Sequence, residues 1–180
     1  MKRILIALVA LLIATTVTAQ EALKREMRTV WIATVSNIDW PQSRGTGTTV
    51  INKQKKQLTD LLDGFAATNM NGVCLQVRPM ADALYKSSYE PWSSYLTGTR
   101  GTDPGWDPLE FAVDECHKRG IECHVWINPY RFSNSGGSEH TTPQDQALKA
   151  SGILMTVGSR VVFNPALEAS RQRVVNVCKE

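Results

Sequence analysis

The chain has little net charge once its first residues are set aside. Lysine and arginine outnumber aspartate and glutamate by 20 to 17 over the 180 residues. Residues 1–19 contain two of the basic residues, Lys2 and Arg3, and no acidic ones, so the remainder carries 18 against 17, or +1. A chain this close to neutral has no excess of cations for phosphate groups. The composition therefore excludes an electrostatic binder of nucleic acid.

The sequence also lacks an apolar run long enough to cross a bilayer comfortably. The run Ile4–Ala14 follows Lys2 and Arg3 and precedes a small-x-small tripeptide at 17–19. This order predicts a secretory signal peptide over 1–19 and export to the periplasm, the cell envelope or the medium. No cysteine follows the run directly, so we expect no lipid anchor and no stable membrane anchor after cleavage. An uncleaved membrane anchor is the alternative.

Cysteine is scarce, with only four residues: Cys74, Cys116, Cys123 and Cys178. They fall inside expected strands or on apolar faces of expected helices, which favours buried free thiols. Export would permit a Cys116–Cys123 bridge, which stays as an alternative. A zinc site in "CHKRGIECH" is disfavoured, because Cys123 and His124 are consecutive on a strand and point to opposite faces. We expect no metal site.

A phosphate-binding glycine motif is missing as well. The segment Gly45-Thr46-Gly47 lacks the third glycine of a dinucleotide fingerprint and lies inside a loop, so we expect no cofactor.

What is present is a regular alternation of strands and helices. Strands are predicted at 27–35, 72–78 and 121–129, because apolar and β-branched residues cluster there. Helices are predicted at 50–68 and 107–120, then near 147–151 and from 164 onward, with a hairpin turning at 158–159. The second helix begins at an Asp107 cap with Pro108 at its first position, and Asn164 with Pro165 predicts the same start for the last. This order is typical of an α/β fold with a parallel sheet.

Polar and aromatic residues follow each of the three strands. The first strand leads to Asn37, Asp39 and Trp40, the second to Arg78 and Asp82, and the third to Asn128 and Tyr130. The carboxyl ends of parallel strands meet at one edge, where α/β folds carry their chemistry. These residues suit a sugar, whose ring has hydroxyl edges and C–H faces. Amides, carboxylates and a guanidinium bind the hydroxyl groups, and the flat aromatic rings stack on the C–H faces.

Each of these residues also has a structural interpretation. Asn37 and Asp39 could shape a turn, Asn128 could shape the loop before Pro129, and Arg78 could pair with Asp82. Trp92, in the long segment between the second strand and the second helix, binds sugar or anchors that segment.

The segments "MRTVWIATVSNIDWP", "LQVRPMADALYKSSYEPWSSYLTG", "GWDPLEFAVDECHKRGIECHVWINPYR" and "VVFNP" together resemble the glycosyl-hydrolase-like 10 family of exported bacterial proteins. The resemblance implies a (β/α)8 TIM barrel that hydrolyses O-glycosidic bonds in bacterial cell-wall or other polysaccharide. It also implies that Arg78, Asp82, Asn128 and Tyr130 line the sugar site. Together with the residues argued above, the expected substrate-binding set is Asn37, Asp39, Arg78, Asp82, Trp92, Asn128 and Tyr130.

Family members continue into a strand that ends in an Asp-Asp pair, and this pair would lie beyond Glu180. We therefore expect residues 20–180 to be a truncated N-terminal portion of the barrel, its first three to four β/α units. Glycoside hydrolysis needs two carboxyl groups, and Asp39 and Asp82 are only weak catalytic candidates here. The alternatives are a non-catalytic module that binds polysaccharide or peptidoglycan glycan, and a fragment that self-associates through an open sheet edge.

Overall fold

The computed structural model describes residues 26–180, so the predicted signal peptide at 1–19 lies outside the described residues. None of the helices in the described part is both long and apolar enough to cross a membrane.

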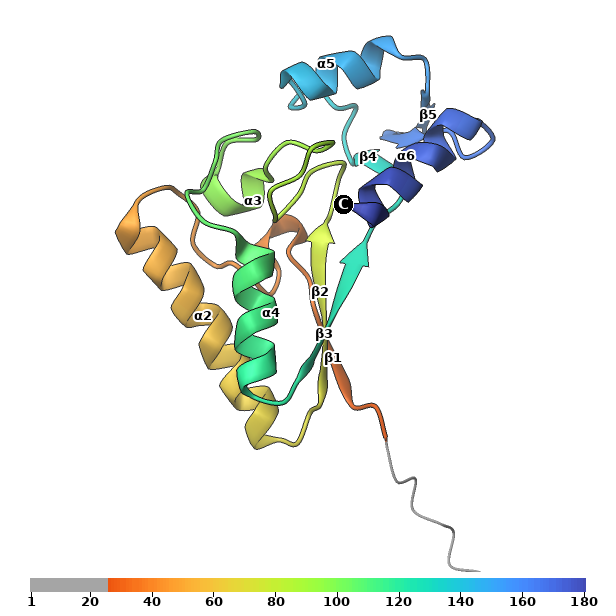
Figure 1. The fold of residues 1–180 in the computed structure, drawn as a ribbon. Helices are drawn as coiled ribbons and strands as arrows, with labels where there is room; N and C mark the ends of the chain where they lie inside the picture. Colours follow the sequence, from red (N-terminus) through yellow and green to blue (C-terminus); the bar gives the residue numbers. More distant parts are fainter. Residues whose placement is uncertain (1–25) are drawn as a thin grey trace, which may run out of the picture.

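The first half of the described chain forms a parallel sheet covered by helices on one face. Strands β1 (Thr29–Ile32), β2 (Gly72–Arg78) and β3 (Glu122–Ile127) pair in the order β1-β2-β3. Helices α2 (Thr48–Ala67) and α4 (Pro108–Lys118) both lie on one side of this sheet (Figure 1). The predicted parallel α/β order is confirmed.

The core of this half lies between the sheet and the two helices. Leu58 and Leu62 of α2 and Val73 and Leu75 of β2 are almost fully buried in one cluster. The helix repeats its apolar residues at helical spacing, and the strand alternates them with period two, so both present one apolar face. Burial of these matched faces drives the two layers together.

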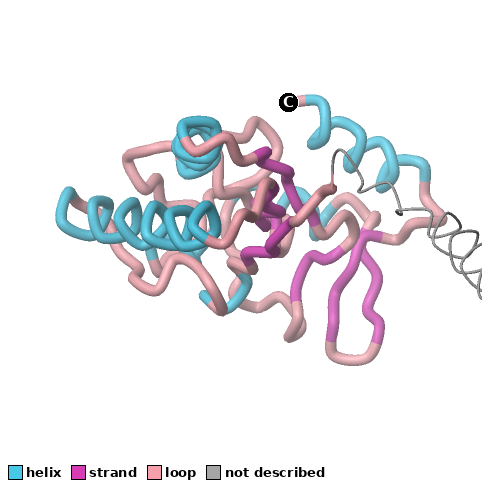
Figure 2. Tube along the Cα trace, turned by 90° about the horizontal axis from the view of Figure 1, so that it is seen from below, coloured by secondary structure: helices cyan, strands magenta, loops and turns pink. Residues whose placement is uncertain are grey.

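The opposite face of the sheet carries no helix (Figures 1 and 2). Trp31 of β1 and Trp126 of β3 meet there edge to face, with ring centroids 5.0 Å apart. Trp31 is 61% exposed. A layer that would cover this face is not among residues 26–180.

The second half forms a small antiparallel sheet that the sequence interpretation predicted only in part. Strands β5 (Leu154–Val157) and β6 (Arg160–Phe163) form the expected hairpin, and β4 (Arg131–Ser133) adds to it in the order β4-β6-β5. Helix α5 (Pro143–Ala150) connects β4 to β5, and helix α6 (Glu168–Lys179) follows β6; both belong to this half of the chain (Figures 1 and 2). A second small core contains Ala81, Phe132, Leu148 and Phe163.

Two helix starts differ from the prediction. Helix α5 begins at Pro143, earlier than predicted, because Thr142 and Asp145 form a reciprocal capping box. Helix α6 begins at Glu168, since the Asn164 side chain accepts from the Ala166 N–H in a turn instead of capping a helix. The long segment after β2 also contains a short helix, α3 (Ser94–Thr97), and a 3-10 turn, η1 (Val35–Asn37), follows β1.

All four cysteines are free, which confirms the favoured prediction. Cys116 is buried and Cys74 and Cys123 are half-buried, but Cys178 is exposed, which corrects its expected place on a buried helix face.

Candidate functional site

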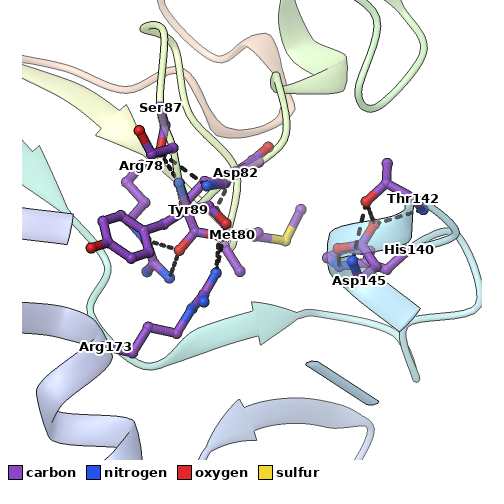
Figure 3. Close-up of polar contacts among 12 residues, drawn as sticks. Arg78, Met80, Asp82, Ser87, Tyr89, His140, Thr142, Asp145 and Arg173 are labelled. Carbon is purple, nitrogen blue, oxygen red and sulfur yellow. Dashed lines mark hydrogen bonds and ion pairs between the residues drawn. The ribbon is translucent and has the colours of Figure 1, made fainter. Parts of the chain in front are cut away.

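Arg78 is the centre of a buried ion network at the carboxyl edge of the parallel sheet (Figure 3). Its Nε and Nη2 donate to Oε1 of Glu90 at 3.0 and 2.7 Å, and Oε2 of Glu90 accepts from Arg173 of α6 at 3.0 Å. Arg78 is 1% exposed, and its guanidinium lies over the Phe163 ring. The alternative pairing of Arg78 with Asp82 is therefore wrong.

Asn128 connects the ends of β2 and β3. Its side-chain Nδ2 donates to the Pro79 carbonyl at 2.9 Å, and its side-chain Oδ1 accepts from the Trp126 indole N–H at 3.1 Å. Its main-chain carbonyl accepts from Arg78 at 2.6 Å. The structure thus brings Arg78 and Asn128 together, as predicted. Their contacts are with other protein groups, however, and they stabilise the loops at the carboxyl ends of β2 and β3.

Asn37 and Asp39 both make local structural contacts after β1. Asn37 Nδ2 donates to the carbonyls of Pro41 and Tyr95 at 2.6 and 2.8 Å, and Asp39 Oδ2 accepts from the Ala33 N–H at 2.7 Å. Trp40, expected at the edge, is fully buried and donates to the Gln54 carbonyl at 2.9 Å. The placement of Trp40 is corrected, because its large apolar ring gains more by burial in the core.

Asp82 is a buried carboxyl held beside Arg100. Its Oδ1 accepts from the Met80 N–H at 2.7 Å (Figure 3), and its Oδ2 lies 3.4 Å from Arg100 Nη1. Burial raises the pKa of Asp82, although the charge of Arg100 acts in the opposite direction. A carboxyl with a raised pKa holds its proton longer, as a general acid must, but Asp82 is only 1% exposed.

Arg100 connects Asp82 to the second half of the chain. It donates to both carboxylate oxygens of Asp145, at 2.9 Å through both Nε and Nη2. Burial acts to raise the pKa of Asp145, but the hydrogen bonds and charge of Arg100 lower it overall. His140 is buried beside this pair, with Nδ1 3.7 Å from Asp145. Burial, together with the charge of Arg100, lowers the pKa of His140 to about 4.

Trp92 packs against the first core and also lines a pocket on the carboxyl side of the sheet, together with Glu90 and Arg100 of the ion networks. The pocket has a volume of about 510 Å³ and is bordered by residues that follow β2 and residues that begin α5. Its lining includes Lys86, Trp92, Asp103, Thr142 and Gln144. An indole beside an ammonium, a carboxylate and an amide can stack on a sugar ring and bind its hydroxyl groups.

Tyr130 stands beside the second core rather than at this pocket. The sequence interpretation missed Glu90 and Arg100, which contact the predicted Arg78 and Asp82. It also missed Arg173 and Asp145, which are the further partners of Glu90 and Arg100. A buried arginine at a strand end requires an acid partner, but the sequence does not show which one.

No group of three or more histidine, cysteine or acidic side chains is arranged to hold a metal ion within residues 26–180.

The comparisons with known proteins agree with one another. The model of the family described as glycosyl hydrolase-like 10 matches residues 26–180. The chain is 41% identical to glycosyl hydrolase YngK of Bacillus subtilis over 157 residues, which cover 87% of this chain and 30% of YngK. It is 34% identical to glycosyl hydrolase DigH of Escherichia coli K12 over 169 residues, 86% of this chain and 38% of DigH.

The chain thus spans about a third of the length of these curated relatives. The family match covers every residue that the structure describes. The chain therefore belongs to the glycosyl hydrolase-like 10 family.

Proposed function

We propose that this chain is the sugar-binding front part of an exported, barrel-type glycoside hydrolase that cleaves O-glycosidic bonds in bacterial cell-wall polysaccharide. The observation that carries the proposal is the family match over 26–180, together with two relatives named glycosyl hydrolases. The order of β1, α2, β2, α4 and β3 is that of the first units of a (β/α)8 barrel. The uncovered sheet face would then point toward the barrel axis.

The Trp92 pocket is the proposed place for a sugar ring. It opens on the carboxyl side of the strands, where barrel enzymes bind substrate. Arg78 and Asn128 hydrogen-bond to protein groups, and the Asp82 carboxyl accepts from the Met80 N–H, so these three residues shape this side of the sheet. Among the residues predicted to bind substrate, Trp92 therefore has the strongest claim to direct contact.

The two carboxyl groups for catalysis would come from the remainder of the longer protein. Asp39 and Asp82, the weak candidates, both bind backbone N–H groups within their own loops. These contacts also favour the second candidate function, a glycan-binding module without hydrolytic activity.

The decisive experiment compares the 180-residue chain with the full-length protein from the same gene. Both are incubated with purified peptidoglycan sacculi, and binding is measured by co-sedimentation and hydrolysis by released reducing ends. The proposal expects binding by both and hydrolysis by the longer protein only. A longer protein that binds but releases no reducing ends would support the binding module, and absence of binding by either would contradict both candidates.

Substitution of Trp92 locates the site within this experiment. Trp92→Ala is expected to weaken binding about two- to twelvefold, since one aromatic stacking contact is worth roughly 0.5–1.5 kcal/mol. The control is Val157→Ala, which removes an exposed apolar side chain from the small antiparallel sheet, away from the pocket. Equal loss in both variants would contradict the assignment of the pocket.

A further inference from the structure

We propose that Cys116 and Cys123 form a redox-active dithiol site, in which Cys123 reacts first with a small disulfide and Cys116 then closes an internal disulfide bond. The two cysteines lie in α4 and at the start of β3, so the proposal does not depend on the glycan-binding proposal.

A tight turn brings the two cysteines together. Cys116 lies in the last turn of α4, and its carbonyl accepts from the N–H groups of Arg119 and Ile121, both at 3.0 Å. Gly120 adopts a φ of +66°, a left-handed conformation that ends the helix and reverses the chain. Cys123, the second residue of β3, then lies directly beside the helix that the chain has just left.

The side chains face each other across this turn. Cys123 shares a sheet face with Val73 of β2, and Val73 packs in the core formed with α2 and α4. Cys116 belongs to the same core, and Cys123 packs against this core. A disulfide bond needs two cysteine side chains that point into the same space, as these two do.

The two thiols differ in their access to reagents. Cys116 is 1% exposed, whereas Cys123 is half-buried and lines a surface cavity of about 560 Å³. The cavity is formed by His117, Gly120, Ile121, Glu122, Cys123 and His124, and Cys116 is not among its lining residues. A small disulfide can therefore reach Cys123 and not Cys116.

The acidity of the thiols has the same asymmetry. The neighbouring Cys116 thiol lowers the pKa of the Cys123 thiol, whereas the neighbouring Cys123, together with burial, raises the pKa of Cys116. Since the thiolate is the nucleophile, Cys123 is the thiol that attacks an external disulfide.

The oxidant is a small disulfide such as glutathione disulfide. The Cys123 thiolate attacks one of its sulfurs, breaks the sulfur–sulfur bond and releases one glutathione thiolate, which takes up a proton. Cys116 then loses its proton and attacks the Cys123 sulfur of the mixed disulfide, releasing the second glutathione. The two protein thiols are oxidised, and one glutathione disulfide is reduced to two thiols.

The test uses the 180-residue chain carrying Cys178→Ser, which removes the exposed competing thiol. After incubation with excess glutathione disulfide, intact mass is expected to fall by the mass of two hydrogens, with no glutathione adduct. Proteolytic peptides should then contain Cys116 joined to Cys123, and Cys74 should remain a free thiol.

Two variants separate the roles. Cys116→Ser is expected to keep one stable glutathione on Cys123, and Cys123→Ser is expected to gain none. Far-ultraviolet circular dichroism checks that both variants fold. An unmodified parent mass, a stable adduct in the parent, or a bond from either cysteine to Cys74 would overturn the proposal. If a variant does not fold, the intact mass and the proteolytic peptides of the Cys178→Ser chain test the proposal by themselves.

Discussion

At the scale of single residues, the charges in the interior are neutralised by specific partners. Arg78 and Glu90 are both almost fully buried, and Arg173 supplies the second cation for Glu90. Arg100 is 7% exposed and contacts both Asp82 and Asp145. Removal of water from a charged group costs several kcal/mol, so each buried ion depends on a partner that stays in place.

We predict that Glu90→Gln destabilises the protein by about 3 kcal/mol, because the buried Arg78 loses its compensating charge. The free energy of unfolding in urea measures this effect. The control is Glu168→Gln, which breaks an exposed pair with Arg171 and should cost less than about 1 kcal/mol. Similar losses in both variants would refute the role of burial.

A second prediction concerns pH. The pKa of the buried His140 is about 4 in the folded protein, against 6.5 as the ordinary value, so the unfolded chain binds the extra proton between these values. The contribution of His140 to stability is therefore complete above pH 6.5 and is lost as the pH falls toward 4. Between pH 7 and pH 5 this loss amounts to about 2 kcal/mol for one such histidine.

The measurement is the free energy of unfolding at pH 7 and pH 5. His140→Gln should lack this part of the acid-induced loss, whereas His117→Gln, at an exposed position on α4, should retain it. A His140→Gln variant with the full wild-type pH dependence would show that another group is responsible.

At the scale of elements, side-chain caps decide where the helices begin. Asp107 accepts from the N–H groups of Leu109 and Glu110 at the start of α4, both at 3.0 Å, as its position before Pro108 predicted. Thr142 caps α5 in the same manner, but α6 has no side-chain cap. The sequence therefore located α4 well, and it failed at α6 because Asn164 serves an ordinary turn.

We predict that Asp107→Ala lowers the free energy of unfolding by about 1 kcal/mol, the usual effect of losing an N-cap. Asp107 also accepts from the Lys86 N–H at 3.0 Å, so its loss should loosen the segment that leads to Trp92. Asp114→Ala, at an exposed position in the same helix, is the control and should change stability by less than about 0.5 kcal/mol. Thermal unfolding followed by circular dichroism reports both.

At the scale of the whole molecule, the helix-free sheet face dominates the behaviour expected of the isolated chain. Trp31 is 61% exposed there, and strands β1 and β3 are both edges of the three-stranded sheet. Apolar faces and open edges of this kind favour association with other chains.

We predict that the isolated 180-residue chain self-associates and that Trp31→Thr weakens this association at least fivefold. Sedimentation velocity over a concentration series measures the effect. Val157→Thr is the matched control, because Val157 is 54% exposed but lies on the small antiparallel sheet. A wild-type chain that stays monomeric throughout the series would contradict the prediction.

The sequence by itself determined the parallel order of strands and helices and the membership of the family, because these depend on local periodicity and on motifs along the chain. Only the tertiary structure decided that Arg78 pairs with Glu90 and Arg173 instead of Asp82, and that Trp40 is buried. Glu90 follows Arg78 by 12 residues, and Arg173 lies 83 residues beyond Glu90. No local pattern specifies such contacts, because a buried charge takes whichever partner the packed chain brings within hydrogen-bonding distance.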